Sequence, residues 1–557
     1  MNTVSECILP AARTFMLVGA IQSVVYPQCL VSRYAVSFPL HASPLYRLPP
    51  RYGPEGRERE KKIQEMARLK GETSMVLDGL QPEAVWKHFD KIRSTPHCSG
   101  HERALAEYIR AYAASRRLEC ATDSCGNLRV CIPASHGRHH RPTLVVQAHL
   151  DMVCEKNTDA EHDFSKEPIG LMLSDGWLSA QGTTLGADNG IGVACALALI
   201  DSPHIEHGPL ELLFTVDEET GLVGASQLDT SLIRGRMLIN LDSEELGVIY
   251  IGCAGGSIAS ITLPVLWEEI RNEMHTAVIK VRGLQGGHSG LDIDKNRGNA
   301  IKILTGLLEH LGTTVPFHLA AIEGGNKHNA IPREAWAEVV FPGDISIQEV
   351  QRTVAMEAQR LRMQMLTDEP TMEISIETGV TSSGRAMDAR TQEKLIKMLA
   401  AIPHGVEAMS ADIAGLVETS NNLAMISIEG DTVRIGTMAR SSVESKMEEM
   451  EKRVMKIAMQ AGAKAVIGER YPGWQPNLAS GLLSLTINAY TDVMQTEPEI
   501  KAVHAGLECG ILGRRFPDMD MVSIGPTIQG AHSPAERVDI GSVEVFWKVF
   551  VRLLSSI

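Results

Sequence analysis

The stretch VVQAHLD at residues 145–151 decides the fold, because the apolar run Leu144–Ala148 ends there in a histidine and an aspartate. Short apolar runs without helical spacing are typical of buried strands. The runs Leu210–Val216 and Met237–Leu241 share this pattern, and a helical pattern at Gly190–Ile200 separates the first two runs. Strands that alternate with helices predict an α/β domain with a mostly parallel central sheet.

The length and charge of the chain limit its class. At 557 residues, with 44% hydrophobic and 22% charged residues, the chain is long enough for two globular domains and an appendage. Its formal net charge of −15 gives no basic footprint for nucleic acid or an anionic membrane. Small solutes are therefore the expected partners.

The N-terminal part of the chain has one apolar run, residues 15–26, which is too short to span a bilayer and lacks the flanks of a signal peptide. The 10 cysteines are too dilute for a disulfide scaffold, and Cys120, Cys125 and Cys131 show no CxxC spacing. We therefore expect a cytoplasmic protein whose cysteines are reduced thiols without a chemical role.

Residues 1–75 differ in composition from the rest, because they are Pro-rich and then charged, with an incomplete helical pattern. This composition predicts a poorly ordered N-terminal extension. One hypothesis is that translation starts at Met66 or Met75, and the alternative is a genuine flexible tail.

The pattern changes after Gly256. Strand-like segments such as Thr276–Val281 and Trp336–Phe341 mix with amphipathic helices such as Ile347–Met363, which predicts a separate α+β domain. From about Tyr471 the chain returns to helix and strand, and this closing segment is expected to rejoin the first domain.

Four segments place metal-type ligands directly after an apolar strand or in the loop that follows it: VVQAHLD (145–151), TLGADNGIG (184–192), FTVDEETG (214–221) and INLDSEE (239–245). Binding groups gather at the carboxyl ends of strands in an open parallel sheet, so these loops are expected to converge. The spacing of His149 and Asp151 suits an imidazole ligand whose other nitrogen is held by a carboxylate. A lone histidine at a strand end is more often a polar cap, and the other three segments favour the ligand.

Each acidic candidate has a plain alternative. Asp188 could bridge two cations or merely cap a helix. Of the adjacent Glu218 and Glu219, one can bind a metal while the other acts as a base, or both can lie on a solvated edge. Asp242 ends an apolar strand, a poor place for a carboxylate unless a cation or hydrogen bonds receive it. His532 lies in the turn-rich loop GPTIQGAHSP, where alone it would be unremarkable.

Several strings resemble the aminoacyl-histidine dipeptidase branch of a two-zinc metallopeptidase family that also includes carboxypeptidase G, peptidase T, carnosinases and aminoacylases. They are HLDMV, GTTLGADNGIG, the Glu-Glu-Thr-Gly turn, NLDSEE, GGHSG, NAIPRE, HAGLECG and GPTIQGAHSP. The resemblance begins near Leu80 and reaches the C-terminus. It implies an α/β zinc-peptidase catalytic domain, residues 76–255 and 471–557, with an inserted α+β lid at 256–470. A homodimer through the lid is a further expectation.

The resemblance also implies two Zn²⁺ ions as cofactors, with Mn²⁺ or Co²⁺ as alternatives. It makes five residues their ligands: His149 and Asp242 for one metal, Glu219 and His532 for the other, and Asp188 for both. Glu218 becomes the general base, and Asp151 becomes the carboxylate that holds His149. The implied reaction is hydrolysis of dipeptides, preferentially Xaa-His, carnosine-like substrates included.

Three lid residues are implied to contact the substrate. His288 of GGHSG would contact the substrate or its oxyanion, and Asn329 of NAIP would supply a polar contact. Arg440 would bind the terminal carboxylate, since a guanidinium offers a bidentate fork. The alternative for Arg440 is a surface arginine near Glu444 in a helix.

Two other functions stay open. One is another amidohydrolase of the same family, such as an aminoacylase, tripeptidase or carboxypeptidase. The other is a metal-free binding relative that keeps the fold, although no ligand type has been lost. The extension before Leu80 and the residue Cys154 after HLDMV depart from the family pattern, and neither removes a proposed catalytic group.

Overall fold

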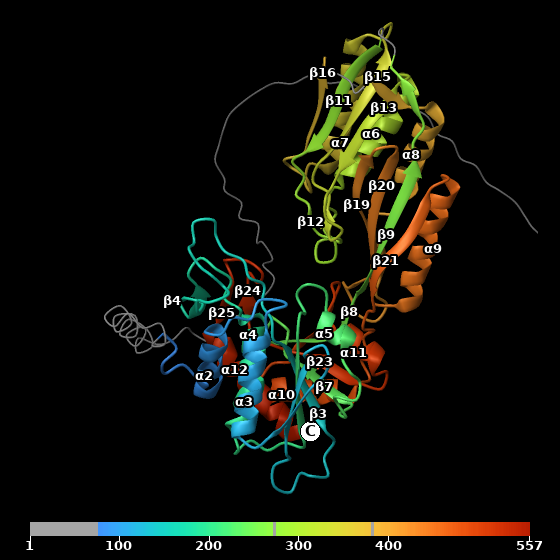
Figure 1. Cartoon of the computed structure of the whole chain (residues 1–557). Helices are drawn as coiled ribbons and strands as arrows, with labels where there is room; N and C mark the ends of the chain where they lie inside the picture. Colours follow the sequence, from blue (N-terminus) through green and yellow to red (C-terminus); the bar gives the residue numbers. More distant parts are fainter. Residues whose placement is uncertain (1–75, 271–273, 380–383) are drawn as a thin grey trace, which may run out of the picture. The chain divides into compact units, whose positions relative to one another are not determined.

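The computed structural model describes residues 76–270, 274–379 and 384–557 (Figure 1). The extension expected at residues 1–75, with both candidate start methionines, lies outside this part of the chain. The described residues form an α/β domain and an inserted α+β domain, as the sequence predicts.

The sheet of the α/β domain has the strand order β1-β2-β6-β3-β7-β23-β8-β22. Its central strands β6, β3, β7 and β23 are parallel, and Gln147 of β3 pairs with Leu213 of β6 and Asn240 of β7. The predicted strands are confirmed. The bounds are β1 (Glu119–Thr122), β2 (Leu128–Ile132), β3 (Leu144–His149), β6 (Leu210–Thr215), β7 (Met237–Asn240), β8 (Val248–Cys253), β22 (Glu499–Val503) and β23 (Asp520–Ser523).

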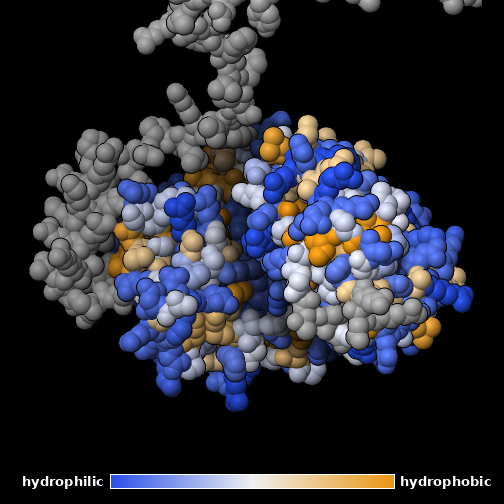
Figure 2. Space-filling model, turned by 90° about the horizontal axis from the view of Figure 1, so that it is seen from above, coloured by the Kyte–Doolittle hydropathy of each residue, from blue (hydrophilic) through white to orange (hydrophobic). Residues whose placement is uncertain are grey.

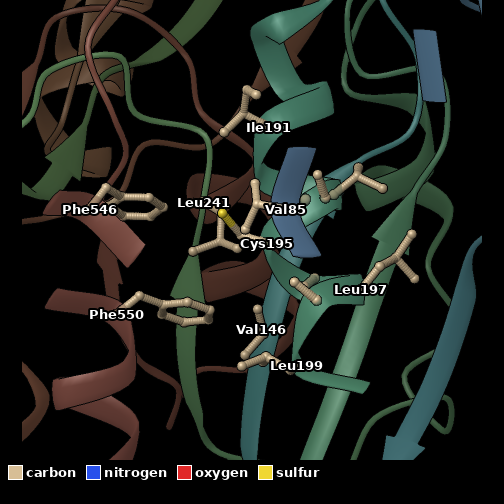
Figure 3. Close-up of a cluster of buried hydrophobic side chains, with 14 of the residues drawn as sticks. Val85, Val146, Ile191, Cys195, Leu197, Leu199, Leu241, Phe546 and Phe550 are labelled. Atoms are coloured by element: carbon tan, nitrogen blue, oxygen red, sulfur yellow. The ribbon is translucent and has the colours of Figure 1, made fainter. Parts of the chain in front are cut away.

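Helices cover both faces of this sheet because successive side chains of a strand point to opposite faces. Val146 of β3 joins one core with Cys195 and Phe550, part of the cluster in Figure 3, whereas Val145 joins the core on the other face. The first core receives α2 (Glu83–Arg93), α3 (Arg103–Ser115), α4 (Ala187–Ile200), α10 (Gly481–Met494) and α12 (Ile540–Ser556), and the second receives α5 (Val223–Gln227) and α11 (Glu508–Arg515).

A smaller antiparallel sheet in the order β24-β25-β5-β4 borders the first core. It brings the segment around residue 530 close to the segment around residue 180, since Val538 pairs with Leu178. Its strands are β4 (Leu171–Ser174), β5 (Trp177–Ala180), β24 (Ile528–Gln529) and β25 (Arg537–Asp539).

The inserted domain has a large antiparallel sheet in the order β16-β11-β15-β13-β19-β20-β9-β21, with β18 paired to β19. Its strands are β9 (Gly255–Pro264), β11 (Met274–Arg282), β13 (His318–Gly324), β15 (Ala335–Pro342), β16 (Glu373–Thr378), β18 (Gly405–Met409), β19 (Val417–Glu429), β20 (Thr432–Ser441) and β21 (Lys464–Tyr471). Two strand pairs stand apart, β10 (Trp267–Glu269) with β17 (Arg385–Met387), and β12 (Gly287–His288) with β14 (Ala330–Ile331).

Apolar residues of four helices pack with this sheet in a separate core. The helices are α6 (Ala300–Thr314), α7 (Ile347–Met365), α8 (Ala389–Ala401) and α9 (Glu444–Gln460). No helix among the described residues is long and apolar enough to cross a membrane. On the face seen in Figure 2, hydrophilic residues predominate and apolar ones are interspersed.

The first and last strands of the inserted domain are neighbours. Gly256 of β9 pairs with Tyr471 at the end of β21, and a Cβ atom on Gly256 would lie only 2.4 Å from the Tyr471 ring. Any larger residue at position 256 would displace the Tyr471 ring. We propose on this basis that the inserted domain comprises residues 256–470.

Candidate metal centre

Metal-type side chains meet at one edge of the parallel sheet. His149 is the last residue of β3, Glu218 and Glu219 follow the end of β6, and Asp242 follows the end of β7. These strands lie side by side and run parallel, so the loops at their carboxyl ends share an edge. Asp188 reaches the same place from the first turn of α4.

The first group consists of His149, Asp188 and Asp242. His149 Nε2 lies 3.2 Å from Asp188 Oδ1 and 3.0 Å from Asp242 Oδ1. Potential ligand atoms of all three side chains lie within 4.8 Å of one another. Asn189 Nδ2 donates to Asp242 Oδ1, which orients this carboxylate.

The second group consists of Asp188, Glu219 and His532. His532 Nε2 lies 3.2 Å from Asp188 Oδ2 and 3.0 Å from Glu219 Oε2. The two oxygens of Asp188 thus face two different histidines, and Asp188 belongs to both groups. Asp188 has extended dihedral angles at a kink in α4 (φ −84°, ψ 110°), and its two carboxylate oxygens are directed at the two imidazoles.

Asp151 holds the turn that carries both glutamates. Its carboxylate accepts hydrogen bonds from Glu218 N at 3.0 Å, Glu219 N at 3.1 Å and Ser99 Oγ at 2.8 Å. Its Oδ1 is 3.5 Å from His149 Nδ1, which lies closer, at 3.1 Å, to the Asp151 backbone carbonyl. The imidazole contact was expected from the sequence, whereas the bonds to the turn were not, because no residue pattern indicates them.

The catalytic-base candidate, Glu218, lies beside the two groups. Potential ligand atoms of Glu218, Glu219 and His149 also fall within 4.8 Å of one another. Burial raises the pKa of Glu218 well above its ordinary value, and the nearby carboxylates add to this effect. Glu218 belongs to neither of the two groups but lies next to both. Its carboxylate can therefore act as a base on a molecule bound between them.

The charges of the site call for cations. Hydrogen bonds to Asp188 and Glu219 raise the pKa of His532 to about 11, and burial raises the pKa of Glu219 and of Asp242. Glu219 Oε1 is buried without a hydrogen-bond partner, a costly state that a cation would relieve. Carboxylate oxygens combined with imidazole nitrogens suit Zn²⁺ and related divalent ions. The two overlapping groups therefore fit a pair of metals.

A buried polar layer lies beneath this edge of the sheet. Gln147 Nε2 and Thr215 Oγ1 both donate to Glu508, and Asn240 Nδ2 donates to Gln147 Oε1. Ser523 Oγ donates in turn to Asn240 Oδ1. Burial raises the pKa of Glu508 to about 7. This layer was not predicted from the sequence, although the carboxylate within HAGLECG was a usable signal.

Two of the three lid candidates lie together. Arg440, on β20, is only 3% exposed, and its guanidinium donates to Tyr471 Oη at 2.8 Å and lies 3.4 Å from both Ser289 Oγ and His288 Nε2. Burial and the nearby guanidinium lower the pKa of His288 to about 4, so this imidazole is neutral. Within the described ranges no carboxylate pairs with Arg440. The alternative of a surface arginine in a helix is therefore wrong.

Asn329 is exposed, and its backbone carbonyl accepts a hydrogen bond from Ser289 N at 2.8 Å. It thereby adjoins the segment of His288. Within residues 76–270, 274–379 and 384–557, no hydrogen bond or ion pair links His288, Asn329 or Arg440 directly to the carboxylates and imidazoles of the sheet edge.

The expectation that the cysteines are reduced is wrong for one pair. Cys98 and Cys154 form a disulfide across 56 residues, with Cα atoms 5.7 Å apart. The loops after α2 and β3 meet here, since Met152 N donates to His97 O at 3.1 Å. Composition could not predict the bond because these two cysteines are far apart in sequence. The other cysteines in the described part of the chain are free.

The fold and the two overlapping groups of ligands are those of a metallopeptidase with an inserted domain. The chain belongs to the peptidase family M20/M25/M40, whose sequence model matches residues 145–556. The chain is 39% identical over 481 residues to a protein of Escherichia coli K12 named cytosol non-specific dipeptidase, covering 86% of this chain and 99% of that protein. It also matches the crystal structure of an aminoacylhistidine dipeptidase from Vibrio alginolyticus, with a TM-score of 0.80 and 38% identity over 86% of this chain and 98% of the other.

Proposed function

We propose that the protein is a metal-dependent dipeptidase that prefers aminoacyl-histidine dipeptides, carnosine-like ones included. The observation that carries the proposal is the pair of carboxylate and imidazole groups that share Asp188. Both relatives that this chain covers almost completely carry the name of a dipeptidase. Their names differ on the preference for histidine, so this preference has to be tested on this chain.

Two Zn²⁺ ions are the proposed cofactors. His149 and Asp242 would hold one ion, Glu219 and His532 the other, and Asp188 both, because each set offers two carboxylates and one imidazole. Bound divalent cations would polarise the scissile carbonyl and favour ionisation of a water near neutral pH.

The protein groups carry the proton and orient the reactants. Glu218 takes a proton from the attacking water and returns it to the leaving amine, a role that suits a carboxylate next to the two groups. Asp151 keeps Glu218 in place through the hydrogen bond to its backbone N–H. His288 would contact the substrate or the oxyanion that forms during attack.

Arg440 is the proposed anchor for the C-terminal carboxylate of the substrate. Its guanidinium is buried, and its described partners Tyr471, Ser289 and His288 are neutral, so an arriving carboxylate would meet an uncompensated cation. Asn329, exposed nearby, would supply a polar contact to the substrate.

A substrate panel tests the function. The full chain is stripped of metal with a chelator, reloaded with Zn²⁺, Mn²⁺ or Co²⁺, and assayed on Ala-His, β-Ala-His, Ala-Ala, tripeptides and N-acetyl amino acids. We expect metal-dependent cleavage of dipeptides, fastest for those that end in histidine. Faster cleavage of tripeptides or N-acetyl amino acids would favour another amidohydrolase of the family, and no cleavage with any metal would favour a binding protein.

Assembly and location are further proposals. We propose a homodimer through the inserted domain, as the family resemblance implies; Met356 and Met363 of α7 and Met459 of α9 are exposed apolar residues of this domain. Sedimentation equilibrium of the full chain tests it, and a monomer at micromolar concentration would contradict it.

The name of the Escherichia coli relative, cytosol non-specific dipeptidase, supports a cytosolic location. The Cys98–Cys154 disulfide points the other way, since such bonds are rare in reducing compartments. Alkylation of free thiols in intact cells, followed by mass spectrometry of both cysteines, tests the location. Two alkylated cysteines would agree with the cytosol.

A further inference from the structure

Glu536 lies four residues after His532, is only 2% exposed, and binds the segment that carries Asp188. Its Oε2 accepts hydrogen bonds from the backbone N–H groups of Leu185 at 2.7 Å and Gly186 at 3.0 Å. Its Oε1 accepts from the next two N–H groups, Ala187 at 2.7 Å and Asp188 at 3.2 Å. Four consecutive N–H groups that converge on one carboxylate form an anion-binding nest.

These N–H groups need this acceptor because the backbone here is not helical. Gly186 has a positive φ of 71°, and Asp188 has φ −84° and ψ 110° although it lies within the first turn of α4. Leu185 and Ala187 are almost fully buried, so water does not replace the missing partners. An N–H group buried without an acceptor is costly, and Glu536 removes this cost from four groups at once.

The conformation that Glu536 stabilises directs the Asp188 side chain. In this conformation Asp188 Oδ1 faces His149 and Oδ2 faces His532. A helical backbone at Asp188 would point its side chain in a different direction from the one that faces both imidazoles. The same short loop that supplies His532 therefore also sets the position of the carboxylate that is common to both groups.

We infer that Glu536 is a positioning residue that holds Asp188 in the geometry needed to bind both metals. The inference rests on the proposed metal centre. Glu536 itself is not a ligand, because both of its oxygens are used by backbone donors. Partners that orient a metal ligand change metal affinity by about 10-fold to 100-fold when they are removed.

The variant Glu536→Gln keeps the shape of the side chain and removes half of the acceptor. Its amide NH₂ would face two backbone N–H groups, so two of the four hydrogen bonds are lost and donor meets donor. Because Asp188 belongs to both groups, the affinity of both metals should fall together. Loss at one site only is the pattern expected for a residue that acts through a single ligand.

The matched control is Asp539→Asn. Asp539 lies three residues further along, and its Oδ1 accepts from Ser542 N at 2.8 Å to cap α12. This variant removes a carboxylate from the same part of the chain and weakens a helix start, but it leaves the Asp188 segment untouched.

The test uses the full chain stripped of metal and titrated with Co²⁺ alone, followed by visible absorption and by calorimetry. The wild type should bind two Co²⁺ per chain, Asp539→Asn should match it, and Glu536→Gln should bind both ions about 10-fold to 100-fold more weakly. Wild-type affinity in Glu536→Gln would overturn this inference alone. Absence of Co²⁺ binding in the wild type would overturn the proposed metal centre together with it.

A second variant covers the case in which Glu536→Gln does not fold, as judged by circular dichroism. Glu536→Asp keeps the charge but withdraws it by one methylene, so it should bind both Co²⁺ ions more weakly than the wild type and Asp539→Asn do. If Glu536→Asp binds Co²⁺ as tightly as Asp539→Asn does, Glu536 does not position Asp188 and the inference fails.

Discussion

Replacing Arg440 by methionine should impair the reaction without destabilising the fold. The buried guanidinium has neutral partners in the described part of the chain. The substrate-free protein therefore contains a buried cation without a compensating anion, which lowers its folding stability. Methionine fills a similar volume without a charge, so the variant should unfold at the same urea concentration as the wild type or at a higher one. Loss of a buried charge pair with the substrate costs about 2–5 kcal/mol. At about 1.4 kcal/mol per factor of ten, kcat/KM should fall about 30-fold to 4,000-fold.

The assay compares Ala-His with its C-terminal amide, Ala-His-NH₂, which lacks the carboxylate. The wild type should prefer the acid by the factor just given, and Arg440→Met should lose this preference. Arg434→Met is the matched control, since Arg434 lies on the same strand but is exposed and pairs with Glu429. An Arg440→Met variant that still prefers the acid as strongly as the wild type would refute the assignment.

Three further outcomes test the site and the fold. Glu218→Gln should lower kcat about 100-fold to 10,000-fold while both metals stay bound, as measured by steady-state kinetics and elemental analysis. Normal turnover would contradict the role of Glu218 as the base. Asp188→Asn should weaken binding of both metals together, because one carboxylate oxygen becomes an amide, and a titration that loses only one metal would contradict the shared position. Breaking the disulfide with Cys98→Ser and Cys154→Ser should lower the free energy of unfolding by about 4 kcal/mol, the chain-entropy value for a loop of this length. Urea unfolding of the double variant and of the wild type measures the difference, and equal midpoints would contradict it.

The sheet of the α/β domain could be predicted because its strands are short apolar runs that end in polar residues. His149 and the Glu218–Glu219 pair stand out against such runs, and their convergence follows from parallel strands. The helix patterns at Gly190–Ile200 and Ile347–Met363 also match α4 and α7 closely.

Other features depend on contacts between residues far apart in the chain, which local sequence patterns do not indicate. β19 buries Ser420, Asn421 and Asn422 completely, so its sequence does not read as a core strand. Arg440 is the penultimate residue of β20, shortly before α9, and its polar neighbours in sequence favour an exposed helix. The bond of Glu536 to the Asp188 segment spans about 350 residues and arises only when β25 pairs with β5.

The adjacency of β9 and β21 makes the inserted domain interchangeable. Its two ends leave the host side by side, at Gly256 and Tyr471, so a short turn from residue 255 to residue 472 could close the chain without reordering any host strand. β8 and β22 would still pair in the host sheet, and the metal-type residues all belong to the host. The proposed substrate contacts of the inserted domain could therefore be replaced as one unit without altering the proposed metal centre.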